Sequence, residues 1–268
     1  MKSFGSPGAR ANGLHAQLMD ALGRRIARGD LPVGSVISPE QIGAEFEVSR
    51  SVVREALRAL EILGMIRPRH KAGTTIQPQA GWALLDPQVI DWRADGPDAD
   101  AQLGELMALR EAVEPAAARI TAGQGDQVLV EGLHGALARM REAYERRSRA
   151  AFVEADTAFH RTMLEGAANA VFSQLVQTLL ATLHARYSDR RQLFTDDTAD
   201  SLERHERVVL AIAARDPEAA AAASVALVRA TGVEVLDGAP PAQRSLPALG
   251  SQPATSAPPA ASASSLEL

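Results

Sequence analysis

The sequence predicts a mainly α-helical protein that is divided into two domains. At 268 residues the chain is long enough for two domains with separate cores. Aromatic residues make up only 4% of it while Ala, Leu, Arg and Glu abound, which favours helix over sheet. Residues 1–78 hold 11 Lys and Arg against 7 Asp and Glu, a balance of +4, whereas residues 79–236 hold 16 against 24, a balance of −8. A basic N-terminal part and an acidic body are expected to have different partners.

The composition excludes several classes of site. The chain has no cysteine, so disulfides, thiolate metal sites and cysteine nucleophiles are absent. The stretch MKSFGSPGARANG at the start lacks the apolar core of a signal peptide, and no run approaches the ~18 apolar residues of a membrane span. We therefore expect a soluble cytoplasmic protein.

The first two helices of the basic part follow from spacing and capping residues. In GLHAQLMDALGRRIARGD, apolar residues recur at i+4 intervals, and Gly29 followed by Pro32 ends the helix. The apolar positions are Leu14, Leu18, Leu22 and Ile26. In SPEQIGAEFE, Ser38 is the expected N-cap and Pro39 takes the first helical position.

The stretch VSRSVVREALRALEILGMI, residues 48–66, reads as a single helix with two different faces and with Ser49 as its N-cap. One face is an apolar stripe that must pack on a core. The stripe consists of Val53, Ala56, Leu57, Leu60 and Leu63. Beside it, Arg50, Arg54 and Arg58 lie one turn apart without a matching acidic ladder, which indicates an anionic partner. Two short adjacent helices, the second of them basic, are typical of a helix-turn-helix, and MIRPRHKAGTTIQP after Gly64 predicts a β-hairpin wing.

These residues resemble the winged-helix domain of the GntR family of bacterial transcription regulators. The family pattern of Val-Ser-Arg, then Val-Arg-Glu-Ala-Leu, then a Gly before the wing stands here as VSRSVVREALRALEILG, and KAGTTI matches the Gly-Thr signature of its wing. One departure is Gln41, which SPEQ places where the family commonly has an arginine. The resemblance implies a DNA-binding set in the recognition helix and the wing, namely Ser49, Arg50, Ser51, Arg54, Lys71 and Gly73.

Composition also marks a linker and a tail. Residues 79–100 are rich in Pro, Gly and Asp and break all periodicity, as a linker does. They hold the two tryptophans of the chain, Trp82 and Trp92, which we expect to cover domain surfaces. The Pro, Ala and Ser-rich end of the chain is expected to be disordered. The predicted division is residues 1–78, the linker 79–100, residues 101–236 and the tail 237–268.

Residues 101–236 read as a run of amphipathic helices, roughly six or seven, with breaks at TAGQGD, EGAANA and ARDPEA. The blocks LMALREAVEPAAARI, FVEADTAFHRTML and LERHERVVLAIAARDPEAA resemble, in that order, the FadR C-terminal (FCD) effector domain of one GntR subfamily. The complete prediction is therefore a mainly α fold, with an N-terminal winged helix-turn-helix and a C-terminal all-α helical bundle.

Three residues of the predicted bundle form a candidate metal site. Asp156 and His160 are four residues apart, so a helix places both on one face, and His205 lies on the inward side of a later helix. A carboxylate and two imidazoles inside a bundle suit Zn²⁺, Mn²⁺ or Ni²⁺, although an Asp156–His160 pair and a core histidine explain the same residues without a metal. The resemblance implies that a divalent metal is possible, because the relatives that bind one use these three ligand positions and a fourth histidine, while other relatives bind none. Leu227 stands at the position of that fourth ligand.

Two arginines are candidate ligands for an effector. Arg110 sits on an apolar helix face where an arginine is normally paired, and Glu114, one turn on, is the simplest partner. Arg186 is a second arginine on an apolar face. Guanidinium groups bind carboxylates bidentately, so both could hold an organic acid beside the metal position.

The predicted function is a homodimeric repressor of operator DNA that a small organic acid releases. Two heads related by a two-fold axis are needed because one helix-turn-helix reaches few base pairs. The block WALLDPQVIDW resembles that of subfamily members controlled by aldonic acids such as gluconate or galactonate, and lactate, other hydroxy acids or dicarboxylates are alternatives. A metal-dependent enzyme is a further alternative, but no Ser-centred elbow, phosphate loop or His-Glu-x-x-His helix occurs. A general DNA-coating protein conflicts with the acidic body.

Overall fold

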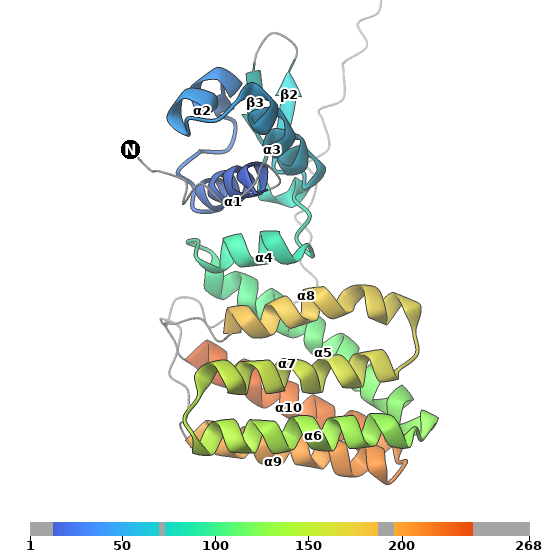
Figure 1. The fold of residues 1–268 in the computed structure, drawn as a ribbon. Helices are drawn as coiled ribbons and strands as arrows, with labels where there is room; N and C mark the ends of the chain where they lie inside the picture. Colours follow the sequence, from blue (N-terminus) through green and yellow to red (C-terminus); the bar gives the residue numbers. More distant parts are fainter. Residues whose placement is uncertain (1–12, 70–72, 187–195, 238–268) are drawn as a thin grey trace, which may run out of the picture.

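The computed structural model describes residues 13–69, 73–186 and 196–237. Figure 1 shows a small N-terminal domain of helices and a hairpin, a bundle of long helices, and one helix, α4, between the two. This architecture confirms the predicted fold class. Among the described residues, the helices include none with the length and apolar character needed to cross a membrane.

The N-terminal domain is a helix-turn-helix with a three-stranded sheet. Its sheet has the strand order β1-β3-β2 with both pairings antiparallel. The elements are α1 (Leu14–Ala27), β1 (Val36–Ile37), α2 (Pro39–Glu45), α3 (Arg50–Ile62), β2 (Ile66–Arg69) and β3 (Gly73–Ile76). The strands β2 and β3 form the predicted wing, whereas β1 is an addition that the sequence does not predict.

Helix α3 is shorter than the 19-residue stretch that reads as helical in the sequence. Its N-cap is Ser49, as expected, with the Ser49 hydroxyl accepting from the backbone N–H of Val52 at 3.4 Å. The helix ends at Ile62 because Gly64 turns the chain with a φ of 72°, a left-handed conformation that favours glycine. A Cβ at Gly64 would also collide with the carbonyl oxygen of Gly81. Ile66 therefore belongs to strand β2 and not to the helix.

The apolar stripe of α3 forms the centre of the N-terminal core. All five of its residues are buried and belong to one cluster with the apolar face of α1 and with Met65, Ile66 and Ile76 of the wing. The stripe therefore fixes the orientation of α3, and the arginine face of the same helix is left to point away from the core.

The segment expected to be a linker contains a packed helix. It holds a 3₁₀ turn, η1 (Gln79–Gly81), and α4 (Pro87–Ala94), whose N-cap Asp86 accepts from the backbone N–H of Gln88. Trp92 of α4 is 1% exposed and its Nε1 donates to Asp20 of α1 at 2.8 Å. Trp82 donates to the carbonyl oxygen of Gln77 at 3.0 Å. Both tryptophans thus pack on the N-terminal domain, and α4 is joined to its core.

The C-terminal domain is a bundle of long helices. Its described helices are α5 (Ala99–Gln124), α6 (Gln127–Glu145), α7 (Arg149–Gly166), α8 (Ala170–Arg186), α9 (Asp196–Ala213) and α10 (Pro217–Asp237). The breaks after α5, α7 and α9 follow the sequence signals, whereas the sequence does not predict the break at residues 146–148, between α6 and α7. Helix α5 packs along α10 and against α7, and α6 packs against α7 and α9, so that α7 and α9 share one core with Phe152, Phe159 and Met140. This arrangement brings residues of α5, α7 and α9 together in the interior. The tail expected from residue 237 lies outside the described residues, apart from Asp237 at the end of α10.

Candidate functional site

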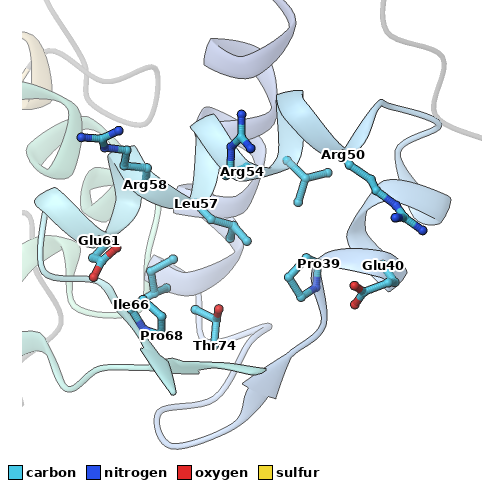
Figure 2. Close-up of a pocket in the computed structure, with 11 residues that line it drawn as sticks. Pro39, Glu40, Arg50, Arg54, Leu57, Arg58, Glu61, Ile66, Pro68 and Thr74 are labelled. Atoms are coloured by element: carbon cyan, nitrogen blue, oxygen red, sulfur yellow. The ribbon is translucent and has the colours of Figure 1, made fainter. Parts of the chain in front are cut away.

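A groove of about 500 Å³ lies between helix α3 and the wing. Figure 2 shows Arg50, Arg54 and Arg58 along one side of it, with Pro68 and Thr74 of the hairpin opposite. Apolar side chains of α3 and β2 also line it, while Glu40 and Glu61 stand at its two ends. The groove is thus an elongated surface with a row of positive charge along one side and an apolar floor.

The start of α3 presents the predicted recognition residues to solvent. Ser49, Arg50, Ser51 and Arg54 are all exposed, and Arg50 and Arg54 line the groove. The hydroxyls of Ser49 and Ser51 lie 2.9 Å apart, which ties the two serines together at the helix N-terminus. Arg54 is 77% exposed in its side chain and lies 3.5 Å from Glu55 of the same helix, a loose pair that a phosphate can displace.

The wing residues of the predicted set are placed only in part. Lys71 lies outside the described residues. Gly73 begins β3 with a φ of 82°, and a Cβ there would come within 2.6 Å of Val36 of β1. The fold therefore requires glycine at position 73 for the close approach of β1, whatever the wing touches.

The start of α2 contributes an acid to the groove, which the sequence reasoning misses. Gln41, the departure from the family pattern, donates its backbone N–H to Ser38 as part of the N-cap at 3.4 Å. Its neighbour Glu40 is the residue that lines the groove, and the Ser38 hydroxyl donates to its Oε2 at 2.8 Å. The signal available in the sequence is an acid at the second helical position of α2, directly before the recognition helix.

In the C-terminal domain, the structure brings the three predicted metal ligands together. Asp156 and His160 of α7 and His205 of α9 are each at most 1% exposed, and each offers one ligand atom within 4.8 Å of the others. His205 Nε2 lies 3.0 Å from Asp156 Oδ1, and His160 Nε2 lies 3.6 Å from the same oxygen. Helix α7 supplies two of the three candidate ligands because i and i+4 share a face, as the spacing predicts.

The orientation of His205 is set by the backbone of its own helix. Its Nδ1 donates to the carbonyl oxygen of Ser201 at 2.7 Å, which leaves the Nε2 lone pair pointing at the Asp156 carboxylate. Burial lowers the pKa of His205 below its ordinary value in spite of Asp156, so the ring is neutral at pH 7. Two acceptors then face one another across 3.0 Å, and among the described residues Nε2 makes no hydrogen bond of acceptable geometry. This is the arrangement that a cation between the two atoms would satisfy.

His160 connects this cluster to helix α5. Its Nδ1 lies 3.0 Å from Oε2 of Glu114. Burial opposes the charged form of His160, but Glu114 and Asp156 outweigh it and raise the pKa of the ring. Burial would raise the pKa of Asp156, but its contacts with His160 and His205 outweigh burial and hold that pKa well below its ordinary value. A metal at this position would therefore compete with a proton on His160.

Arg110 is buried beside the cluster and is paired. It is 1% exposed, and its Nε and Nη2 donate to the two carboxylate oxygens of Glu114 at 2.6 and 3.3 Å. Its Nη2 also lies 3.1 Å from His160 Nε2. Burial alone would raise the pKa of Glu114, but Arg110 and then His160 lower it to about 2. The simplest partner expected for Arg110 is thus present, and the same pair reaches the histidine cluster.

Leu227 and Arg186 are the remaining residues that the sequence singles out in this domain. Leu227 of α10, at the position of the fourth family histidine, is 1% exposed and packs in the main core of the bundle. Arg186 is the last residue of α8, and its side chain lies outside the described part of the structure. The contact of Glu114 with His160 is new relative to the sequence reasoning, which pairs Glu114 with Arg110 alone.

Comparison with known proteins matches both halves of the chain. Residues 14–76 match the model of bacterial regulatory proteins of the gntR family, and residues 105–230 match the FCD domain. The chain is 30% identical over 213 residues to the HTH-type transcriptional regulator YieP of Escherichia coli (strain K12), which covers 79% of this chain and 91% of that protein. It is 28% identical over 215 residues to the galactonate operon transcriptional repressor of the same strain, with 79% and 92% covered.

A solved structure has the same fold. The structure of Lar, which controls the expression of the Listeria monocytogenes agr system, aligns with a TM-score of 0.61 and 16% identity. It covers 88% of this chain and 99% of its own. At this identity the likeness concerns the fold alone.

Proposed function

The chain belongs to the GntR family of bacterial regulatory proteins and has an FCD domain after its DNA-binding head. On that premise we propose that the protein is a homodimeric repressor, which a small organic acid releases from its operator. It is a DNA-binding transcriptional regulator with a small-molecule effector. In the proposal, residues 1–78 bind DNA and residues 101–236 bind the effector and the second subunit.

The proposed DNA interface is the face of α3 that lines the groove. In this proposal, bases and flanking phosphates are contacted by the residues at the start of α3, namely Ser49, Arg50, Ser51 and Arg54. In the wing, Lys71 and Gly73 contact the neighbouring DNA backbone. The exposed arginine row beside an apolar floor supports this assignment. Because one head reads few base pairs, two copies on a palindrome supply the specificity that a repressor needs.

The observation that carries the regulatory half of the proposal is the lone pair of His205 facing the Asp156 carboxylate in a buried site. Asp156, His160 and His205 fit a divalent ion such as Zn²⁺, Mn²⁺ or Ni²⁺ in chemistry and spacing. Leu227 offers no fourth protein ligand, so a bound ion would act as a Lewis acid with coordination positions left for water or a carboxylate.

The effector class follows from the charges around the cluster. Arg110 can exchange one oxygen of Glu114 for the carboxylate of a ligand, and Arg186 is the second proposed contact. A relative named for the galactonate operon supports aldonic acids such as galactonate or gluconate as the effector, with lactate and dicarboxylates as the next candidates. In this proposal the cluster senses an acid and does not transform it, so the protein is not an enzyme.

Metal binding tests the cluster directly. Wild-type protein stripped of metal is titrated with Zn²⁺, Mn²⁺ and Ni²⁺, and the bound ion per chain and the melting temperature are measured. We expect about one ion per chain and a higher melting temperature, both lost in His205→Gln. His134→Gln is the matched control, since His134 of α6 is exposed and far from the cluster in sequence. Equal metal content in wild type and His205→Gln would place the ion elsewhere.

A thermal-shift screen then tests the effector. Metal-loaded protein is scanned with galactonate, gluconate, lactate and dicarboxylates, with neutral sugars as controls. The proposal expects a shift for one class of acid and none for the matching neutral sugar, because the carboxylate supplies the contact. A response to neutral sugars of the same size would refute the carboxylate as the recognised group. Conversion of the acid during the incubation would refute the sensing role.

A further inference from the structure

Glu40 is a carboxylate in a groove that three arginines also line. It lies at the end of the groove where Arg50 stands, and Glu61 lies at the opposite end beside Arg58, as Figure 2 shows. Near phosphates an exposed carboxylate costs affinity, because like charges repel. A carboxylate that touches the DNA therefore favours binding only where it accepts a hydrogen bond, and on DNA such donors are found on the base edges.

The geometry of Glu40 is held by its neighbours. The Ser38 hydroxyl donates to Glu40 Oε2 at 2.8 Å, while the same serine caps helix α2. That hydrogen bond and the nearby Arg50 lower the pKa of Glu40, so it is ionised at pH 7. A carboxylate accepts up to about four hydrogen bonds, so the contact with Ser38 leaves capacity for a base.

The pairing of a guanidinium with a carboxylate matches one base pair in particular. In the major groove, guanine presents the acceptors O6 and N7, and its paired cytosine presents the N4 amino donor beside them. Arg50 has the donors for guanine, and Glu40 has the acceptors for cytosine. We propose that Glu40 is a specificity-determining residue, which accepts a hydrogen bond from the N4 amino group of a cytosine in the half-site that Arg50 reads. The inference rests on the proposed DNA interface of α3.

The experiment compares two acids of the same groove. An operator is selected from random DNA with the wild-type full-length protein, and the affinities of wild type, Glu40→Ala and Glu61→Ala are measured on every single base-pair variant of it. Both substitutions remove one negative charge from the groove and an exposed side chain, so general electrostatics change alike. We expect Glu40→Ala to lose at least about fivefold of discrimination for cytosine at one position of each half-site, and Glu61→Ala to keep it.

A modified base makes the test specific for the proposed atom. N4-methylcytosine at that position removes the donor in the major groove, so wild type should lose the same factor while Glu40→Ala is indifferent to the methyl group. An identical base preference in wild type and Glu40→Ala would overturn the inference. Equal gains of affinity for both alanine variants on all sequences would also overturn it, because Glu40 would then only weaken DNA binding through charge repulsion. A wild-type protein that selects no sequence would instead overturn the proposed interface, and this inference with it.

Discussion

Arg50 begins helix α3 and lies in the groove at the end that Glu40 marks. If its guanidinium reads a guanine, Arg50→Ala should weaken operator binding by about 1 to 3 kcal/mol and relax the preference at that base pair. Binding to random DNA should fall much less. Fluorescence anisotropy on the operator and on a scrambled duplex measures both quantities.

The control for this prediction removes the same charge from the other domain. Arg139 is an exposed residue of α6, so Arg139→Ala lowers the net charge equally without touching the groove. It should leave the operator preference unchanged. Equal weakening of Arg50→Ala on operator and scrambled DNA would show that Arg50 contacts phosphate and reads no base.

Glu114 is predicted to stabilise the fold in a pH-dependent way. Its pKa of about 2 in the folded chain lies below the ordinary value of 4.5, so its contribution is complete above pH 4.5 and is lost as the pH falls toward 2. Glu114→Gln leaves Arg110 buried without its anion and should cost on the order of 3 kcal/mol at pH 7. The difference in free energy of unfolding between variant and wild type, measured with urea, should then disappear as the pH falls from 4.5 to 2.

Glu111 provides a matched comparison on the same helix. It pairs with Arg229 at 2.6 Å, but both side chains are exposed by more than a third. Glu111→Gln should therefore cost at most about 1 kcal/mol, because solvent screens the pair. If the difference in free energy of unfolding between wild type and Glu114→Gln stays constant from pH 7 to pH 2, the account of the buried pair is contradicted.

Among the elements, α4 depends on a glycine of α1. A Cβ at Gly23 would come within 2.6 Å of the Trp92 ring, and the whole indole would have to move. Gly23→Ala should destabilise the protein by about 1 to 3 kcal/mol and shift the tryptophan fluorescence as Trp92 leaves its site. The measurement is thermal unfolding followed by both fluorescence and circular dichroism.

Gly123 of α5 provides the control, because it is a second helical glycine but has no close neighbour. It is exposed and nothing lies within 4 Å of the position of its Cβ, so Gly123→Ala should be neutral or stabilise the helix by up to about 1 kcal/mol. Unchanged stability and fluorescence in Gly23→Ala would mean that α4 does not need the close contact with α1.

Elements that are specified by neighbouring residues can be predicted from the sequence, whereas contacts between elements far apart in the chain cannot. The capping serines and the apolar spacing of α1 to α3 are local, and the structure confirms them. Strand β1 has two residues, Val36–Ile37, which is too short for an alternating pattern. The contact between Glu114 and His160 joins α5 to α7, and no spacing in the sequence predicts it. Composition marks residues 79–100 as irregular, yet Trp92 packs α4 into the N-terminal core.

At the scale of the whole molecule, the segment between the domains is bonded to both. Helix α4 packs on α1 through Trp92, and Arg24 of α1 pairs with Asp91 and Asp95. On the other side, Gln102 of α5 donates to the carbonyl oxygen of Ile90 at 2.8 Å, and Thr178 of α8 donates to that of Leu85 at 2.7 Å. These contacts form a continuous path of packed elements between α5 or α8 and the head, along which we propose that a shift in the bundle reaches the DNA-binding face.

The buried cluster joins α5, α7 and α9, so a ligand that separates Arg110 from Glu114 changes the packing of those helices. The change in operator affinity can be no larger than the differential affinity of the acid for the two arrangements. By the same linkage, operator DNA should weaken binding of the acid by the factor by which the acid weakens binding of DNA.

Release of the operator by the acid is the most direct test of the account. Because Arg110→Ala alone would strand Glu114, the variant is Arg110→Met together with Glu114→Gln, which removes both charges of the buried pair. Operator affinity of the metal-loaded proteins is measured against galactonate, or against whichever acid the thermal screen identifies. The account predicts that wild type dissociates as the acid is added, whereas the double variant binds the operator with nearly wild-type affinity and stays bound. Equal release of both proteins, or no release of wild type by any acid of the panel, would contradict it.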